Sequence, residues 1–168
     1  MSQNPVSKLL LKTFDGSMSR LIITPKCDQT EVELHIQYYD YDEDKTLKKV
    51  KIRFHSVVSI DFEVNYFDNC IGAELFGFYE IDWLEKKREM IEKVFHTRKD
   101  GFLLHGNYDY EPDNGHDMLN FRERIQAVYE NIGQYHLYQQ QTEGGIYYML
   151  AKGFALIEET QQIGRAHV

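Results

Sequence analysis

The sequence predicts an α+β fold, in which a largely antiparallel β-sheet carries one or two helices packed on one face and ends in a C-terminal β-hairpin. Three observations lead to this prediction. Polar and apolar residues alternate over several segments of the first half, as they do in strands with one wet face. After residue 80 the apolar spacing becomes that of a helix, and near the end a glycine-containing turn separates two strand-like segments.

Strands are expected at residues 21–24, 31–38, 50–55, 58–66 and 75–79. The alternating segments are typical of an antiparallel sheet that is covered on one side. Segment 75–79 is more continuously apolar, which predicts a central position. The shortest strand should end at Pro25, and the polar residues 40–45 should form a hairpin loop.

A helix is expected at residues 82–97, where apolar side chains recur on one helical face. Asp82 and Glu85 are spaced as a capping box at its start, and Gly101 should end it. A short strand at 102–105 and a loop at 107–117 are expected to follow.

A second helix is predicted at 118–132 because its apolar residues are spaced by four, three and four, and Gly133 should end it. Residues 134–140 and 145–150 flank a turn at 141–144, which predicts the C-terminal hairpin. Residues 154–157 should begin or continue a strand.

The length of 168 residues is typical of one domain, expected at residues 1–162. The last six residues, 163–168, can be encoded by a DNA sequence that resembles a widely used sequencing adapter. We therefore expect them to be adapter read-through and exclude them from fold reasoning. On this interpretation the natural C-terminus is missing.

The chain is acidic, with 19 Lys and Arg against 27 Asp and Glu, a net charge of −8 and a pI near 5.3. This charge disfavours nucleic-acid binding, which depends on phosphate contacts, and favours a basic partner. Solubility alone is the alternative explanation. Two cysteines are too few for a disulfide scaffold and suggest a reducing cytoplasm. No apolar run approaches the about 18 residues of a membrane span, and no signal peptide is expected.

Motifs for nucleotide binding and for nucleophilic catalysis are absent: neither glycine-rich phosphate loop occurs, and there is no nucleophile elbow. Residues 40–44 resemble the start of a calcium loop. Lys45 and Lys51 stand where that loop needs glycine and glutamate, so no calcium site is expected. No cofactor is predicted.

One stretch, from 105 to 117, could support metal binding or acid–base chemistry. Imidazole and carboxylate side chains together can hold zinc or another divalent ion. The candidate residues are His105, Asp109, Asp113 and His116. Their spacing matches no established metal signature, and a solvated acidic loop explains the same residues. A metal-dependent enzyme or small-ligand protein therefore remains an alternative.

The 12 tyrosines are the remaining pattern, and several stand beside acidic residues on two expected loops. Tyrosine offers rigid contact area at low entropic cost, and carboxylates attract a basic partner. The tyrosines could also simply fill sheet positions, where their propensity is high. The expected partner contacts are Asp40, Tyr41, Asp42, Asp44, Asp109, Tyr110, Glu111 and Asp113.

Three segments carry a resemblance to a known class. Residues 54–69, together with 135–138 and 147–152, resemble segments of small bacterial immunity-type proteins encoded beside polymorphic or contact-dependent toxins. The resemblance covers roughly residues 20–157. It implies a non-enzymatic cytoplasmic protein that binds and neutralises a cognate toxin domain. Such proteins diverge at their binding surfaces, so the resemblance assigns no contact residue. A regulatory interaction module without a toxin fits the sequence equally.

Overall fold

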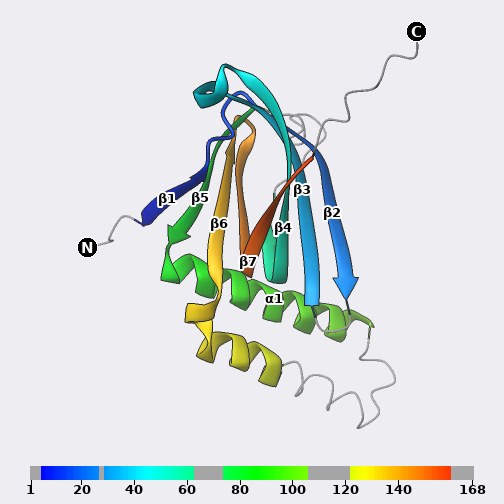
Figure 1. The fold of residues 1–168 in the computed structure, drawn as a ribbon. Coiled ribbons are helices and arrows are strands. Elements are labelled where there is room, and N and C mark those ends of the chain that lie inside the picture. The colour runs from blue at the N-terminus through cyan, green and yellow to red at the C-terminus, as the bar shows by residue number, and fades with distance from the viewer. Residues whose placement is uncertain (1–4, 27–28, 63–73, 106–121, 160–168) are drawn as a thin grey trace.

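The α+β prediction is confirmed by a computed structural model that describes residues 5–26, 29–62, 74–105 and 122–159, with residues 98–105 as backbone only. Seven antiparallel strands form one sheet in the order β1-β5-β6-β7-β4-β3-β2 (Figure 1). The strands are β1 (Val6–Leu11), β2 (Ser17–Lys26), β3 (Gln29–Asp40), β4 (Thr46–Asp61), β5 (Leu75–Asp82), β6 (His136–Thr142) and β7 (Gly145–Glu158). The helices are α1 (Leu84–His105), a helix at 122–130, and the short 3₁₀ turns η1 (Tyr41–Glu43) and η2 (Ile132–Gln134).

The sheet folds over on itself instead of lying flat. Phe54 of β4 and Phe78 of β5 are three strand spacings apart in the sheet order, which would be about 14 Å in a flat sheet. Their ring centroids are 5.9 Å apart. Within β4, Ser56 has a φ of 51° and the pairing with β7 shifts register between Val57 and Ser59, which are irregularities typical of a bent strand.

Folding the sheet creates two layers whose inner faces form the larger core. Buried residues of β3 and β4 face buried residues of β5, β6 and β7. At one end, the upper end in Figure 1, the layers are bridged by pairing between Gly16 and Leu75. A side chain at Gly16 would lie 2.6 Å from the carbonyl oxygen of Gln37, so this junction requires glycine.

A second core lies under the helices. Met90 and Ile91 of α1 and Ile125 of the helix at 122–130 are buried against Ile81, Leu137 and Leu150 of the sheet. Figure 1 shows α1 crossing the sheet, with the helix at 122–130 beside it. The helices therefore pack on the outer face of β4, β5, β6 and β7, which explains the helical spacing of the apolar residues.

The first helix differs from the prediction at both ends. Asp82 is the last residue of β5, so the expected cap at that position is wrong and the helix begins at Leu84. It continues through Gly101 to His105, so the short strand expected at 102–105 is also wrong. A helical glycine costs only about 1 kcal/mol, and the following leucines favour a helix.

The strand predictions hold with changes in extent. The segments 50–55 and 58–61 belong to one bent strand, β4, while 63–66 lie outside the described residues. β2 continues through Pro25, because an edge strand needs no second hydrogen-bonding neighbour at a proline. β5 lies inside the sheet, but it is the second strand from the edge and not the central one. The edge strand beside it is β1, which the alternation of polar and apolar residues did not predict.

The C-terminal hairpin is confirmed: Thr142 pairs with Gly145 across a two-residue turn, and β7 includes the expected strand at 154–157. The second helix is described over 122–130 and is followed by η2, which contains Gly133. Residues 118–121 and the suspected adapter-derived residues 163–168 lie outside the described residues.

Candidate functional site

The upper end of the sheet collects acidic residues from four separate segments. We call this surface the acidic tip; it comprises Asp15, Asp40, Tyr41, Asp42, Glu43, Asp44, Glu74 and Glu143. The β3–β4 hairpin supplies five of these residues, and the β1–β2 link supplies Asp15. Pairing of Gly16 with Leu75, and a 2.8 Å hydrogen bond from the Glu143 amide to the Glu74 carbonyl, bring in the others.

Asp40 holds the hairpin in shape. Its Oδ1 accepts a 2.9 Å hydrogen bond from the amide of Asp42, which caps the 3₁₀ turn. Lys48 Nζ lies 3.1 Å from Asp40 and 3.1 Å from Glu43, and the bond to Lys48 lowers the pKa of Asp40. The turn closes with Asp44 in the left-handed conformation at a φ of 50°. Asp40, which was predicted as a partner contact, therefore stabilises the hairpin turn through its bonds to Asp42 and Lys48.

Tyr41 and Asp42 are two exposed residues of the predicted contact set. Tyr41 is 56% exposed, and its hydroxyl donates a hydrogen bond to Asp15, which raises the pKa of Tyr41 and lowers that of Asp15. The side chain of Asp42 is 74% exposed and lies 3.1 Å from that of Lys12, which is 63% exposed. Asp44 is also exposed. The structure thus brings together the first half of the predicted contact set.

Asp15, Glu74 and Glu143 give the tip an excess of negative charge. A side-chain hydrogen bond with Asp15 is the largest cause that raises the pKa of Glu74, followed by desolvation and the charges of Asp15 and Glu143. The carboxylates of the tip outnumber the lysines beside it, which are Lys12, Lys45 and Lys48. The sequence analysis did not predict Asp15, Glu74 or Glu143 as site residues. The Asp15–Gly16 dipeptide was a usable turn signal, but the proximity of Glu74 and Glu143 depends on the folded sheet.

A hollow of about 310 Å³ opens beside the tip. Leu10, Leu11 and Tyr38 line it with apolar surface, while Phe14 and Tyr39, each 39% exposed, are also in its wall. Lys45 Nζ lies 5.5 Å from the centre of the Tyr39 ring, a distance suited to a cation–π contact. The tip therefore combines open carboxylates with exposed aromatic surface.

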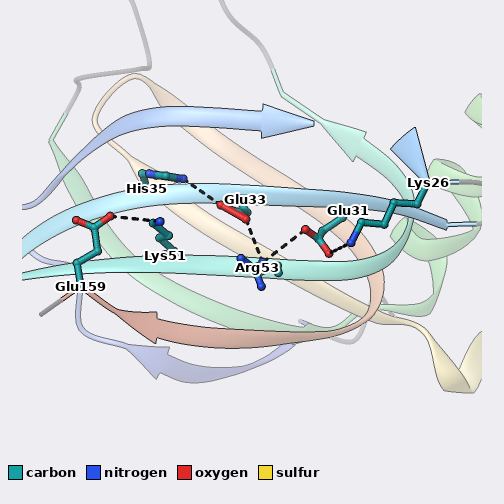
Figure 2. Close-up of polar contacts among 7 residues, drawn as sticks. All are labelled: Lys26, Glu31, Glu33, His35, Lys51, Arg53 and Glu159. Atoms are coloured by element: carbon teal, nitrogen blue, oxygen red, sulfur yellow. Dashed lines mark hydrogen bonds and ion pairs between the residues drawn. The ribbon is translucent and has the colours of Figure 1, made fainter. Parts of the chain in front are cut away.

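A second charged region covers the outer face of β2, β3 and β4, and we call it the charge ladder (Figure 2). It comprises Lys26, Glu31, Glu33, His35, Lys51, Arg53 and Glu159. Arg53 Nε lies 3.0 Å from Glu33 and 3.5 Å from Glu31, and Lys26 Nζ lies 2.8 Å from Glu31. His35 contacts Glu33 at 3.1 Å, and Lys51 contacts Glu159 at 3.7 Å. These charges are matched within the fold.

The remaining predicted site residues fall on a part of the chain that is not described. Asp109, Tyr110, Glu111, Asp113 and His116 lie within residues 106–121, and His105, the last residue of α1, is described by its backbone alone. The structure therefore tests neither the second half of the predicted contacts nor the alternative metal site. Within the described residues, no group of three or more His, Cys, Asp or Glu side chains could hold a metal ion.

Comparison of the chain with protein-family models, with curated proteins and with solved structures found no match. Among the described residues, no helix combines the length and the apolar run that crossing a bilayer requires.

Proposed function

We propose that this protein is an immunity-type inhibitor that binds a cognate, basic toxin domain through the acidic tip and catalyses no reaction itself. The observation that carries the proposal is the exposed excess of carboxylates beside exposed aromatic side chains, on a hairpin held rigid by Asp40 and Lys48. The resemblance of residues 54–69, 135–138 and 147–152 to immunity-type proteins gives the kind of partner.

The physical case rests on two complementary effects. Carboxylates that repel one another, as Asp15, Glu74 and Glu143 do, are relieved by a cationic surface, and their field accelerates encounter with a basic domain. Tyr41 and Tyr39 add rigid contact area next to those charges. A rigid hairpin also loses little conformational freedom when it binds.

Two further parts of the proposal rest on residues that the structure does not describe. Asp109, Tyr110, Glu111 and Asp113 are proposed to extend the binding surface, because they repeat the combination of acid and tyrosine. The compartment is proposed to be a reducing cytoplasm, in agreement with the two cysteines of the sequence.

The test begins with the genes on either side of this reading frame. The C-terminal domain of a neighbouring secreted-protein gene is expressed with and without this protein, and cell survival and complex formation are measured. The proposal expects rescue and a complex whose association rate falls as salt is raised. If the domain from the neighbouring gene is harmless to cells, or if this protein does not bind it, the inhibitor function is overturned. The protein would then be an interaction module without a toxin.

The role of the tip is tested separately with the double variant Tyr41→Ala and Asp42→Lys. It should bind the toxin domain at least about tenfold more weakly, chiefly through slower association, because contact area and attraction are both lost. Glu123→Lys, the same charge reversal at an exposed position of the helix at 122–130, is the matched control and should bind like the parent. Equal binding by parent and double variant at low salt would exclude the tip as the interface.

A further inference from the structure

Among the described residues, two polar side-chain atoms in the larger core have no hydrogen-bond partner: Oε1 of Gln140 and the hydroxyl of Tyr147. Each residue is 2% exposed. Gln140 and Tyr147 are directly opposed on β6 and β7, so their side chains leave the sheet on the same face and lie side by side. Burying two such groups without partners is costly, which calls for an explanation.

The orientation of the Gln140 amide is determined by its neighbours. Its Nε2 lies 3.2 Å from the carbonyl oxygen of Gly77 and 3.0 Å from that of Gln141, and both oxygens require a donor. Nε2 also lies 3.1 Å from Thr13 Oγ1, whose own hydrogen is donated to the Phe76 carbonyl at 2.6 Å. Turning the amide over would set its oxygen against these acceptors. The unpartnered atom is therefore the oxygen, an acceptor.

Both side chains line a small cavity between the two layers of the sheet. Its volume is about 10 Å³, and its other walls are Leu34, Phe54, Phe62, Phe78, Tyr138 and Met149. That volume is about what a single water molecule needs, and it is too small for an organic ligand. The tyrosine hydroxyl can donate to a water oxygen, and the same water can donate to the amide oxygen, so one water gives a partner to each of the two unpartnered protein atoms.

We propose that the cavity is a binding site for one internal water molecule, which bridges the Tyr147 hydroxyl and Gln140 Oε1. This inference is independent of the proposed function. The water completes a polar assembly that joins β6, β7, the start of β5 and Thr13 in the link between β1 and β2. Because Thr13 is fully buried and lies two residues before Asp15, the assembly also supports one of the segments that form the acidic tip.

The first test is a crystal structure of the full chain at a resolution that shows ordered water. Density for one water within hydrogen-bond distance of both atoms is expected. An unoccupied cavity, or a direct hydrogen bond between the two side chains, would overturn the proposal.

The second test is the variant Tyr147→Phe, which removes only the hydroxyl. Loss of a water-bridged hydrogen bond should lower the melting temperature by roughly 2–4 °C. If the hydroxyl had no partner at all, its removal would relieve a desolvation cost and leave the protein as stable as the parent or more stable, which would refute the site. Tyr39→Phe, at a residue that is 39% exposed, is the control and should show no measurable shift.

Discussion

The acidic tip and the charge ladder contain the same kinds of charged side chain, yet their charges are neutralised differently. In the ladder each carboxylate lies within 4.0 Å of a cationic or protonatable group of the same chain. In the tip Asp40, Asp42 and Glu43 each lie 3.1 Å from a lysine, but the described residues show no ion pair within 4.0 Å for Asp15, Asp44, Glu74 or Glu143. Asp15 and Glu74 face each other instead. Adjacent strands place opposed side chains about 5 Å apart, so the register of the ladder strands pairs each carboxylate, while the turns of the tip leave four carboxylates without a cationic partner.

This difference separates stability from binding. Glu33 has a side chain that is only 16% exposed and two partners within 3.1 Å, so little of its charge is left for another molecule. Asp42, with 74% of its side chain exposed, gains little from Lys12, because exposed ion pairs contribute about 0–1 kcal/mol. Substitutions at charges that are paired within the chain, such as Glu33, should therefore change the stability of the fold. Substitutions at exposed charges of the tip, such as Asp42, should change the affinity for a partner.

The largest expected effect is at the most deeply buried matched charge, Lys86 of α1. Its Nζ lies 2.9 Å from Asp61 of β4, 3.1 Å from Glu89, and 4.8 Å from the centre of the Tyr148 ring. Asp61→Ala should lower the free energy of unfolding by about 2 kcal/mol, because it leaves a 9% exposed lysine with one exposed partner. Urea denaturation measures this loss, and binding to the proposed partner should not change.

Glu89→Ala is the matched control for that prediction. It removes the other carboxylate of Lys86, whose side chain is 66% exposed, and should cost less than about 1 kcal/mol. Equal losses for the two variants would mean that burial does not decide the value of these pairs, and the comparison between ladder and tip would lose its basis.

A smaller effect is expected in the ladder itself. Burial alone would raise the pKa of Glu33, but hydrogen bonds from Arg53 and His35 outweigh it and lower that pKa below its ordinary value. A lowered pKa in the folded state stabilises the protein above the unfolded pKa, and this contribution is lost as the pH falls through the folded pKa. Glu33→Gln should therefore cost about 1 kcal/mol at pH 7 and progressively less in acid.

Urea denaturation of parent and Glu33→Gln at pH 7 and pH 3 checks this prediction. Asp42→Asn serves as the control from the tip and should leave stability nearly unchanged at both values. A cost for Glu33→Gln that persists undiminished at pH 3 would show that the side chain acts through packing and not through its charge.

Local pattern was sufficient to predict most strands, the helix face and the final hairpin, since each depends on residues close in sequence. Alternation over 31–38 is the burial pattern of β3, where Val32, Leu34 and Ile36 are buried. The strand β1 was missed because its residues, Val6–Leu11, lack alternation and are held by pairing with β5. Gly101 predicted an end to α1, but a single glycine costs a helix only about 1 kcal/mol, and α1 continues to His105.

The candidate site was predictable only where a single loop contains it. Asp40, Tyr41, Asp42 and Asp44 are consecutive or nearly so, and the expected hairpin placed them together. The proximity of Asp15, Glu74 and Glu143 follows from the pairing of Gly16 with Leu75 and from the fold of the sheet over itself. Contacts between residues that are about 60 or more positions apart leave no local trace in a single sequence.

The smallest effect, and the one that most directly opposes the ladder, is expected at Glu74. Its hydrogen bond with Asp15, its desolvation and the charges of Asp15 and Glu143 raise its pKa above the ordinary value. A raised folded-state pKa means that the favourable contribution is complete below the unfolded pKa and is lost as the pH rises through the folded pKa. Glu74→Gln should therefore raise the melting temperature slightly at pH 7, and this gain should disappear in acid.

Melting temperatures of parent and Glu74→Gln between pH 3 and pH 8 measure this effect, with Glu123→Gln as an exposed control away from the tip. The decisive quantity is the sign: removing a carboxylate should stabilise the protein at the tip and destabilise it in the ladder at the same pH. If Glu74→Gln and Glu33→Gln both lower stability at pH 7, the tip is matched within the fold as the ladder is. Its carboxylates would then have no excess charge to offer a partner.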